Sequence, residues 1–339
     1  MEENFDILNI LREQKEIKLK GNLYHYVQVI FAYNTNHIEG STLTEEETRY
    51  IFNEKSIPPK NTATKLNDIL ETINHFKLVD YMLDVADKNL DENMIKEFHK
   101  ILKQNTNDSE KSWFAVGDYK KLTNEIGISG TKTTSPENVG KEIKNLLLNY
   151  NKIEQKTIED IIDFHVKFEK IHPFQDGNGR VGRIIMFKEC LKENIVPFII
   201  LDKNKDFYYR GLKEYETEKG YLIDTCLDSQ DYFAEMVKYY LAGASIDTFL
   251  EKNKIILSYL YDEVKGKGYF EKCYNREDGF SLDLIEDDIK NGLITEFKRK
   301  GNTYLLYKDE NKKIAINIKT NSIIKENKLK DLVQDDLVE

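Results

Sequence analysis

A twelve-residue stretch at positions 172–183, HPFQDGNGRVGR, constrains the fold of this chain more than any other part of its sequence. It joins two segments whose apolar residues recur every three to four positions, as they do in helices packed against a core. Pro173 cannot continue the first helix, and the small residues from Gly177 to Gly179 open the second. The stretch therefore predicts two helices that meet at a tight loop carrying several polar side chains.

Helical periodicity also covers most of the remaining chain, which has only five prolines. The sequence TEEE at residues 44–47 is typical of a capping box that opens a helix, and Thr157 with Asp160 predicts another. We therefore expect a mainly α protein. Besides the two helices that flank the motif, helices are expected at about residues 23–38, 62–86, 91–103, 136–150, 207–218 and 231–253.

Two regions depart from the helical pattern. Residues 106–136 contain several glycines, and apolar and polar side chains alternate from Leu122 to Ile128, which predicts a loop with a short β-hairpin at about residues 120–135. After residue 253, the sequence predicts further helix and then two or three strands separated by polar turns. We therefore divide the chain into an N-terminal helical segment, a helical core and a small α/β appendage, at residues 1–60, 61–250 and 251–339.

The composition excludes several classes of protein. A formal net charge of −10 argues against broad binding to nucleic acid, which requires a basic face. Three widely spaced cysteines form neither a disulfide framework nor a metal knuckle, and indicate buried thiols in a reducing compartment. The N-terminal residues lack the apolar core of a secretory signal, and no apolar run reaches membrane-spanning length. These features predict a cytoplasmic protein that does not enter a membrane.

The motif has the chemistry of a phosphate site. The backbone N–H groups of Gly177, Asn178 and Gly179 can close around an anion, which the positive end of the helix dipole also favours. Arg180 and Arg183 are three positions apart and therefore share one face of the helix. Two guanidinium groups beside such a cradle suit a polyphosphate better than a single carboxylate.

Two further side chains of the motif add a metal ligand and a base. A carboxylate at Asp176 would repel phosphates unless a cation lay between them, which predicts Mg²⁺. His172 carries an imidazole that titrates near neutral pH, so it is the natural general base. The motif therefore predicts a nucleoside triphosphate, Mg²⁺ and an incoming hydroxyl group, although the phosphate-loop pattern GxxxxGK[ST] is absent.

HPFQDGNGRVGR resembles the signature of Fic-domain proteins, HPFx[DE]GNGRxxR, at every specified position. The resemblance implies an all-α catalytic core at 61–250 that transfers AMP from ATP to a Ser, Thr or Tyr hydroxyl of a target protein, and of the enzyme itself. It implies that His172 deprotonates this hydroxyl and that Asp176 holds Mg²⁺ between the α- and β-phosphates. By position, the phosphate oxygens would be bound by Gly177, Asn178, Gly179, Arg180 and Arg183.

The same resemblance implies roles outside the motif. The hairpin at about residues 120–135 matches the family's flap, which pairs with an extended segment of the target protein as an added strand. Tyr209 is expected near the adenine ring. Fic-domain proteins often form dimers, so the resemblance also allows a homodimer.

A second stretch, TNHIEG at residues 35–40, resembles the inhibitory pattern [ST]xxxE[GN] of the same family, with Thr35, Glu39 and Gly40 at the specified positions. The Glu39 carboxylate could pair with Arg183 and occupy the group meant for the γ-phosphate. ATP would then bind with its α-phosphate misaligned for attack. The alternative is that Glu39 and Gly40 simply end a helix.

Our leading prediction is an autoinhibited protein adenylyltransferase, and three other functions stay open. The first is removal of AMP, with Glu39 aligning a water molecule. The second is kinase-like transfer of the γ-phosphate, although relatives that do this depart from GNGRxxR. The third is a non-enzymatic interaction or DNA-binding module, with the C-terminal appendage as a winged-helix-like element, but the appendage lacks an evident basic recognition helix and the chain is acidic.

Overall fold

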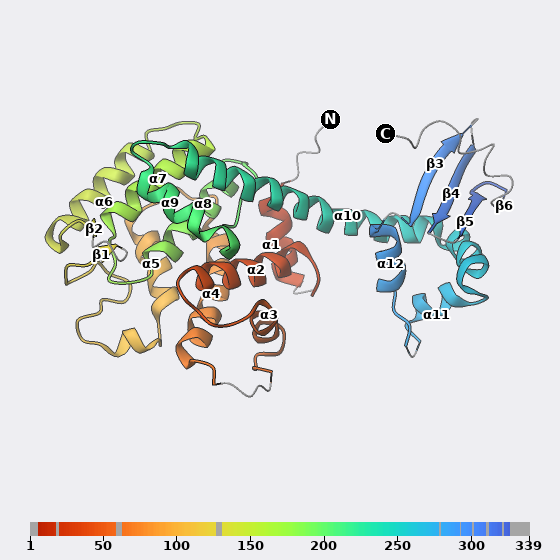
Figure 1. Cartoon of the computed structure of the whole chain (residues 1–339), viewed down its shortest axis with the longest axis horizontal. Helices are drawn as coiled ribbons and strands as arrows, with labels where there is room; N and C mark the ends of the chain where they lie inside the picture. Colours follow the sequence, from red (N-terminus) through yellow and green to blue (C-terminus); the bar gives the residue numbers. More distant parts are fainter. Residues whose placement is uncertain are drawn as a thin grey trace. The chain divides into compact units, whose positions relative to one another are not determined.

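The computed structural model describes residues 6–17, 20–58, 63–126, 131–277, 279–291, 293–299, 302–309, 312–320 and 322–325. The chain divides into two compact units, Met1–Val237 and Lys238–Glu339. The first is helical and the second adds a small sheet, which confirms the mainly α fold class with a C-terminal α/β part (Figure 1). The predicted three-part division stays a prediction, and the structure groups residues 1–60 with most of the predicted core.

Helices joined by loops make up the first unit. They are α1 (Ile7–Ile17), α2 (Leu23–Ile38), α3 (Glu45–Glu54), α4 (Leu66–Val85), α5 (Glu92–Lys103), α6 (Pro136–Tyr150), α7 (Ile158–Ile171), α8 (Asn178–Lys192) and α9 (Lys205–Glu214), with the short 3-10 helices η1 (Asn107–Glu110) and η2 (Asp202–Asn204). The long helix α10 (Gly220–Lys265) begins in this unit and ends in the second. Among the described residues, no helix combines the length and the apolar character needed to cross a membrane.

Local sequence determines where two of these helices begin. At α7, the Thr157 hydroxyl accepts a hydrogen bond from the backbone N–H of Asp160, and the Asp160 carboxylate accepts one from the backbone N–H of Thr157. Thr44 and Glu47 form the same capping box at α3. The sequence predicts both boxes because their partners are only three residues apart.

Helix α8 is buried on nearly all sides and contacts α2, α4, α5 and α7. Its buried residues include the charged side chains of Arg180, Arg183, Lys188 and Glu189. Charges in a protein interior require paired partners, because burial removes their hydration. Lys188 and Glu189 pair with each other within α8, whereas Arg180 and Arg183 pair with carboxylates from outside the helix.

The predicted hairpin lies between η1 and α6. Strands β1 (Glu125–Ile126) and β2 (Thr131–Lys132) pair antiparallel, with Glu125 opposite Lys132. The residues that connect them, 127–130, lie outside the described residues. The structure thus confirms a hairpin within the predicted range of 120–135.

The second unit contains a four-stranded antiparallel sheet in the order β3-β4-β5-β6. A buried cluster joins the end of α10 to this sheet through residues that include Leu257, Tyr261, Leu305 and Ile316. The sequence predicted two or three strands, and the structure adds the short β6. The elements are β3 (Ile294–Arg299), β4 (Asn302–Lys308), β5 (Lys313–Asn317) and β6 (Ile323–Lys325), with helices α11 (Tyr269–Asn275) and α12 (Asp283–Lys290).

Close packing of α9 against the start of α10 makes Gly211 sensitive to substitution. A Cβ atom at this position would lie 2.7 Å from Leu222 Cα and 2.8 Å from Leu222 N. Because the clash is with backbone, we expect Gly211→Ala to lower the free energy of unfolding by about 1–3 kcal/mol in urea denaturation.

Gly140 provides the matched control for this prediction. It lies within α6, and a Cβ atom there would approach Tyr119 Cε2 only to 3.7 Å. Gly140→Ala should therefore raise the free energy of unfolding by about 0.5–1 kcal/mol. Equal stability of the two variants would contradict the packing of α9 on α10.

Candidate active site

His172 ends α7 in a left-handed backbone conformation, with φ 52° and ψ 63°. Few residues with a side chain adopt it, and here it turns the chain sharply into the loop. The Glu169 carbonyl oxygen lies 3.3 Å from Nδ1 of His172, which favours a proton on Nδ1. In the neutral ring, Nε2 then carries no proton. Burial lowers the pKa of His172 to about 4, so the ring is neutral at pH 7 and can accept a proton.

Asn178 holds the loop between α7 and α8. Its Oδ1 accepts a hydrogen bond from the Phe174 N–H at 2.8 Å, and its Nδ2 donates to the Phe174 carbonyl at 2.8 Å. Phe174 is fully buried and stacks on His99, with ring centroids 3.9 Å apart. The Asn178 side chain therefore has a structural role, and any contact with phosphate falls to its backbone N–H at the start of α8.

Two glycines have separate roles at the start of α8: Gly177 adopts the backbone turn before the helix, and Gly179 leaves room for charged side chains close to it. Gly177 has a φ of 87°, a conformation that favours glycine. At Gly179, a Cβ atom would lie 2.3 Å from Glu39 Oε1 and 2.9 Å from Arg183 Nη1. A side chain at this position would therefore displace the Glu39 carboxylate from the first turn of α8.

The structure brings the two predicted motifs together at Arg183. Its Nη2 lies 2.6 Å from Glu39 Oε1, and its Nε donates to the Thr35 hydroxyl at 2.8 Å. Arg183 is 2% exposed, and Glu39 ends α2 immediately before Gly40, which has a φ of 91°. Burial works to lower the pKa of Arg183, but the Glu39 carboxylate outweighs it and leaves that pKa raised. Glu39 thus neutralises the guanidinium group that the sequence assigns to phosphate.

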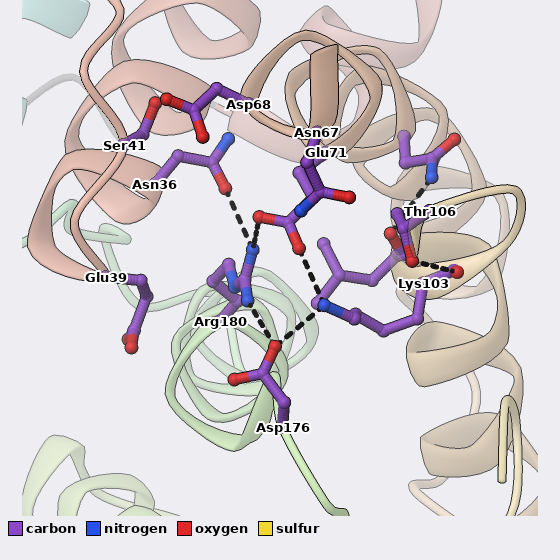
Figure 2. Close-up of polar contacts among 12 residues, drawn as sticks. Asn36, Glu39, Ser41, Asn67, Asp68, Glu71, Lys103, Thr106, Asp176 and Arg180 are labelled. Carbon is purple, nitrogen blue, oxygen red and sulfur yellow. Dashed lines mark hydrogen bonds and ion pairs between the residues drawn. The ribbon is translucent and has the colours of Figure 1, made fainter. Parts of the chain in front are cut away.

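The other motif arginine, Arg180, lies in a second ionic network (Figure 2). Its Nη2 lies 3.0 Å from Asp176 Oδ2, and its Nη1 is paired with Glu71 of α4. Lys103, at the end of α5, contacts Glu71 at 2.6 Å and Asp176 at 2.7 Å. Burial works to raise the pKa of Asp176, but Arg180 and Lys103 outweigh it and hold that pKa below its ordinary range. Asp176 is therefore ionised near neutral pH.

Asp176 fits the predicted role of a magnesium ligand. Its side chain is 47% exposed, and Mg²⁺ is commonly held by one or two carboxylates together with phosphate oxygens and water. Among the described residues, Glu71, Asp108 and Asp176 place carboxylate oxygens within 4.8 Å of one another, as a metal site requires. Lys103, however, contacts all three carboxylates. Asp176 is thus the member that can reach a metal on the open side.

The two tyrosines of α9 differ in how they relate to the site. Tyr209 is 44% exposed, and its hydroxyl donates to the Ile38 carbonyl at 3.1 Å, beside Glu39. Tyr208 is buried, and its hydroxyl accepts a hydrogen bond from Arg183 Nη1 at 3.4 Å. Tyr209 therefore lies at the edge of the site, where its predicted contact with adenine stays a prediction, and Tyr208 supports Arg183.

Lys120 ties the hairpin to the loop between α7 and α8. Its backbone N–H donates to the Pro173 carbonyl at 2.9 Å, and its Nζ donates to Asn124 Oδ1 and Thr133 Oγ1 at 2.6 Å each. Asn124 and Thr133 flank the two strands of the hairpin. Among the described residues, Lys120 forms no ion pair with a carboxylate, and burial lowers the pKa of its amine to about 8.

Sequence reasoning missed Glu71, Lys103, Asp108 and Tyr208. Lys103 falls on the buried stripe of an amphipathic helix, four residues after His99. A lysine on such a stripe signals a buried ion pair, although the sequence does not identify its partners. Glu71 and Asp108 come from separate segments, so only the folded chain brings them to Lys103.

Residues 89–190 match the model of the Fic/DOC family. This segment contains the motif at residues 172–183, the hairpin and the helices α5 to α7, together with most of α8. It does not contain Glu39, Glu71 or Tyr208.

Curated relatives carry the name protein adenylyltransferase. The Fic protein of Nematostella vectensis is 27% identical over 185 residues, which cover 54% of this chain and 42% of that protein. The fic-1 protein of Caenorhabditis elegans is 25% identical over 189 residues, which cover 54% of this chain and 35% of that protein. The chain thus spans less than half the length of these relatives.

Solved structures share the fold. A Fic domain containing signaling protein from Bacteroides thetaiotaomicron superposes with a TM-score of 0.56 at 20% identity, covering 70% of this chain and 96% of that one. A fragment of C. elegans Fic-1 superposes with a TM-score of 0.54 at 18% identity, covering 72% of this chain and 73% of that one. At these identities the likeness establishes the fold alone.

Proposed function

Residues 89–190 of this chain are a Fic domain, and from this premise we propose that the protein is an adenylyltransferase that moves AMP from ATP to a hydroxyl of a target protein. The observation that carries the proposal is the turn after α7, where His172 sets Nδ1 against the Glu169 carbonyl and the chain passes through Asp176 into the glycine-rich start of α8, which carries Arg183. General acid–base catalysis requires such a positioned base. Anchoring a triphosphate requires the amide groups and the cations.

In the proposed reaction, Nε2 of His172 takes the proton from the target hydroxyl. The hydroxyl oxygen forms a bond to the α-phosphorus of ATP, the bond from that phosphorus to its bridging oxygen breaks, and pyrophosphate leaves. Asp176 would hold Mg²⁺, which neutralises phosphate charge when bound. Arg183 and the first N–H groups of α8 would orient the phosphates, because positioning and electrostatics dominate phosphoryl chemistry.

We also propose that Glu39 restrains this activity. The 2.6 Å contact between Glu39 Oε1 and Arg183 Nη2 supports the proposal, because a carboxylate on this guanidinium excludes a phosphate from it. The approach of Glu39 to Gly179 supports it further, since the carboxylate lies on the turn of α8 where the phosphates would bind. ATP would then bind with its α-phosphorus out of line with the target hydroxyl.

Transfer of isotope from differently labelled ATP tests the proposed reaction. Glu39→Gly enzyme is incubated with a lysate and with ATP carrying ³²P at either the α- or the γ-position. Compared with lysate alone, whose own kinases transfer γ-label, the enzyme should add label to protein from α-labelled ATP and not from γ-labelled ATP. An increase in γ-label alone would replace the proposal with kinase-like phosphoryl transfer.

The target segment is proposed to pair with the hairpin as an added strand. Because Lys120 holds both ends of the hairpin to the loop, Lys120→Met should misplace the target and raise the KM for it by about tenfold or more, with the KM for ATP little changed. Lys121→Met, at the exposed neighbouring residue, should behave like wild type. Steady-state kinetics on the identified target would measure both, and equal effects of the two variants would contradict the anchoring role.

A further inference from the structure

Lys103 lies at the centre of three carboxylates. Its Nζ atom is 2.6 Å from Glu71 Oε1, 2.6 Å from Asp108 Oδ2 and 2.7 Å from Asp176 Oδ2. A lysine ammonium group has three N–H donors, so each carboxylate can receive one of them. The Lys103 side chain is 0% exposed, and Figure 2 shows it reaching across from α5 toward α4 and the start of α8. It thus takes the place that a metal ion would occupy among these oxygens.

The charges around Lys103 balance without a metal. Glu71 also pairs with Arg180, and Asp108 pairs with Lys111 through its second oxygen at 2.7 Å. Three cations therefore face three carboxylates: Lys103, Arg180 and Lys111 against Glu71, Asp108 and Asp176. A divalent cation entering this cluster would meet an ammonium group a few ångströms away, and buried like charges repel strongly.

We propose that Lys103 is a positioning residue that acts as a resident cation, blocking nucleotide-independent metal binding by the carboxylate cluster and fixing Asp176 at the entrance to α8. Glu71 and Asp108 then act as counter-ions of Lys103 and not as metal ligands. Asp176 remains the exposed carboxylate of the three, so a divalent ion would gain its other ligands from the nucleotide. Metal recruitment is thereby coupled to the arrival of phosphate charge.

Mn²⁺ binding without nucleotide tests this proposal by electron paramagnetic resonance. Wild-type protein and Lys103→Arg, which keeps the cation, should bind Mn²⁺ weakly. Lys103→Met leaves a three-carboxylate site with an excess of negative charge and should bind one Mn²⁺ at least about tenfold more tightly, because a repelling unit charge has been removed. Adding Glu71→Gln to Lys103→Met should remove the gained affinity. Lys103→Gln replaces Lys103→Met if circular dichroism shows that the methionine variant is unfolded.

Two results would overturn the proposal. One is a folded, lysine-free variant that gains no affinity for Mn²⁺. The other is wild-type protein that binds Mn²⁺ as tightly as the lysine-free variant, with Asp108→Asn abolishing that binding. The inference deepens the proposed function at the step of metal recruitment, but Mn²⁺ binding needs neither a target protein nor AMP transfer. A failure of the inference about Lys103 can therefore be distinguished from a failure of the proposed AMP transfer.

Discussion

Replacing His172 with alanine is expected to reduce AMP transfer by about 10²–10⁴-fold, because the target hydroxyl loses its proton acceptor. The measurement is incorporation of label from α-labelled ATP, made in the Glu39→Gly background so that the parent rate is high. ATP affinity, measured by calorimetry, should stay close to that of the parent, since the phosphate contacts belong to α8. Unchanged transfer in a folded His172→Ala variant would rule out the proposed base.

The pH profile gives an independent check on the same residue. A base works when it is deprotonated, so activity should persist below pH 6.5, the ordinary value for histidine, and fall only toward pH 4. Burial is the main cause of this low pKa, and Lys120 lowers it further, whereas the Glu169 carbonyl, Glu39 and Asp176 raise it. An acid limb of kcat near pH 6.5 in folded enzyme would show that His172 is exposed to solvent during the reaction.

Glu39→Gly is expected to increase AMP transfer, including transfer to the protein itself, by about a hundredfold. The reason is that a displacement of about 1 Å in the reacting atoms can cost roughly 10² in rate, and the variant removes the carboxylate that causes it. Glu39→Gln keeps the shape and removes the charge, so it should give a smaller increase. Initial rates with α-labelled ATP should increase in the order wild type, Glu39→Gln, Glu39→Gly.

Glu54 supplies the control, because it is a glutamate at the end of α3 that pairs only with Lys20 among the described ion pairs. Glu54→Gly should leave the rate at the wild-type level. The Glu39→Gly protein should also melt at a lower temperature without nucleotide, because its buried Arg183 loses its counter-ion. ATP should raise its melting temperature more than that of wild type. A rate of AMP transfer by Glu39→Gly at or below that of wild type would contradict the proposal that Glu39 restrains the activity.

Some features of the site could be predicted because they are local in sequence. His172 and the residues from Asp176 to Arg183 share one loop and the first turns of one helix, so their proximity follows from spacing alone. The capping boxes at Thr44 and Thr157 are predictable for the same reason. The TNHIEG stretch could be matched to an inhibitory pattern, but its contact with Arg183 joins residues 144 positions apart. That contact required α2 to pack beside α8.

The sequence by itself determined the helix–loop–helix frame, the hairpin and the set of groups gathered at positions 172–183, because backbone preferences and short-range hydrogen bonds act within a few residues. Only the tertiary structure decided that Glu39 lies on Arg183, that Tyr208 rather than Tyr209 supports it, and that Lys103 fills the carboxylate cluster. The physical reason is the burial of α8: the charges of Arg180 and Arg183 must be neutralised in the interior, and Glu71 and Glu39 come from helices that pack against it.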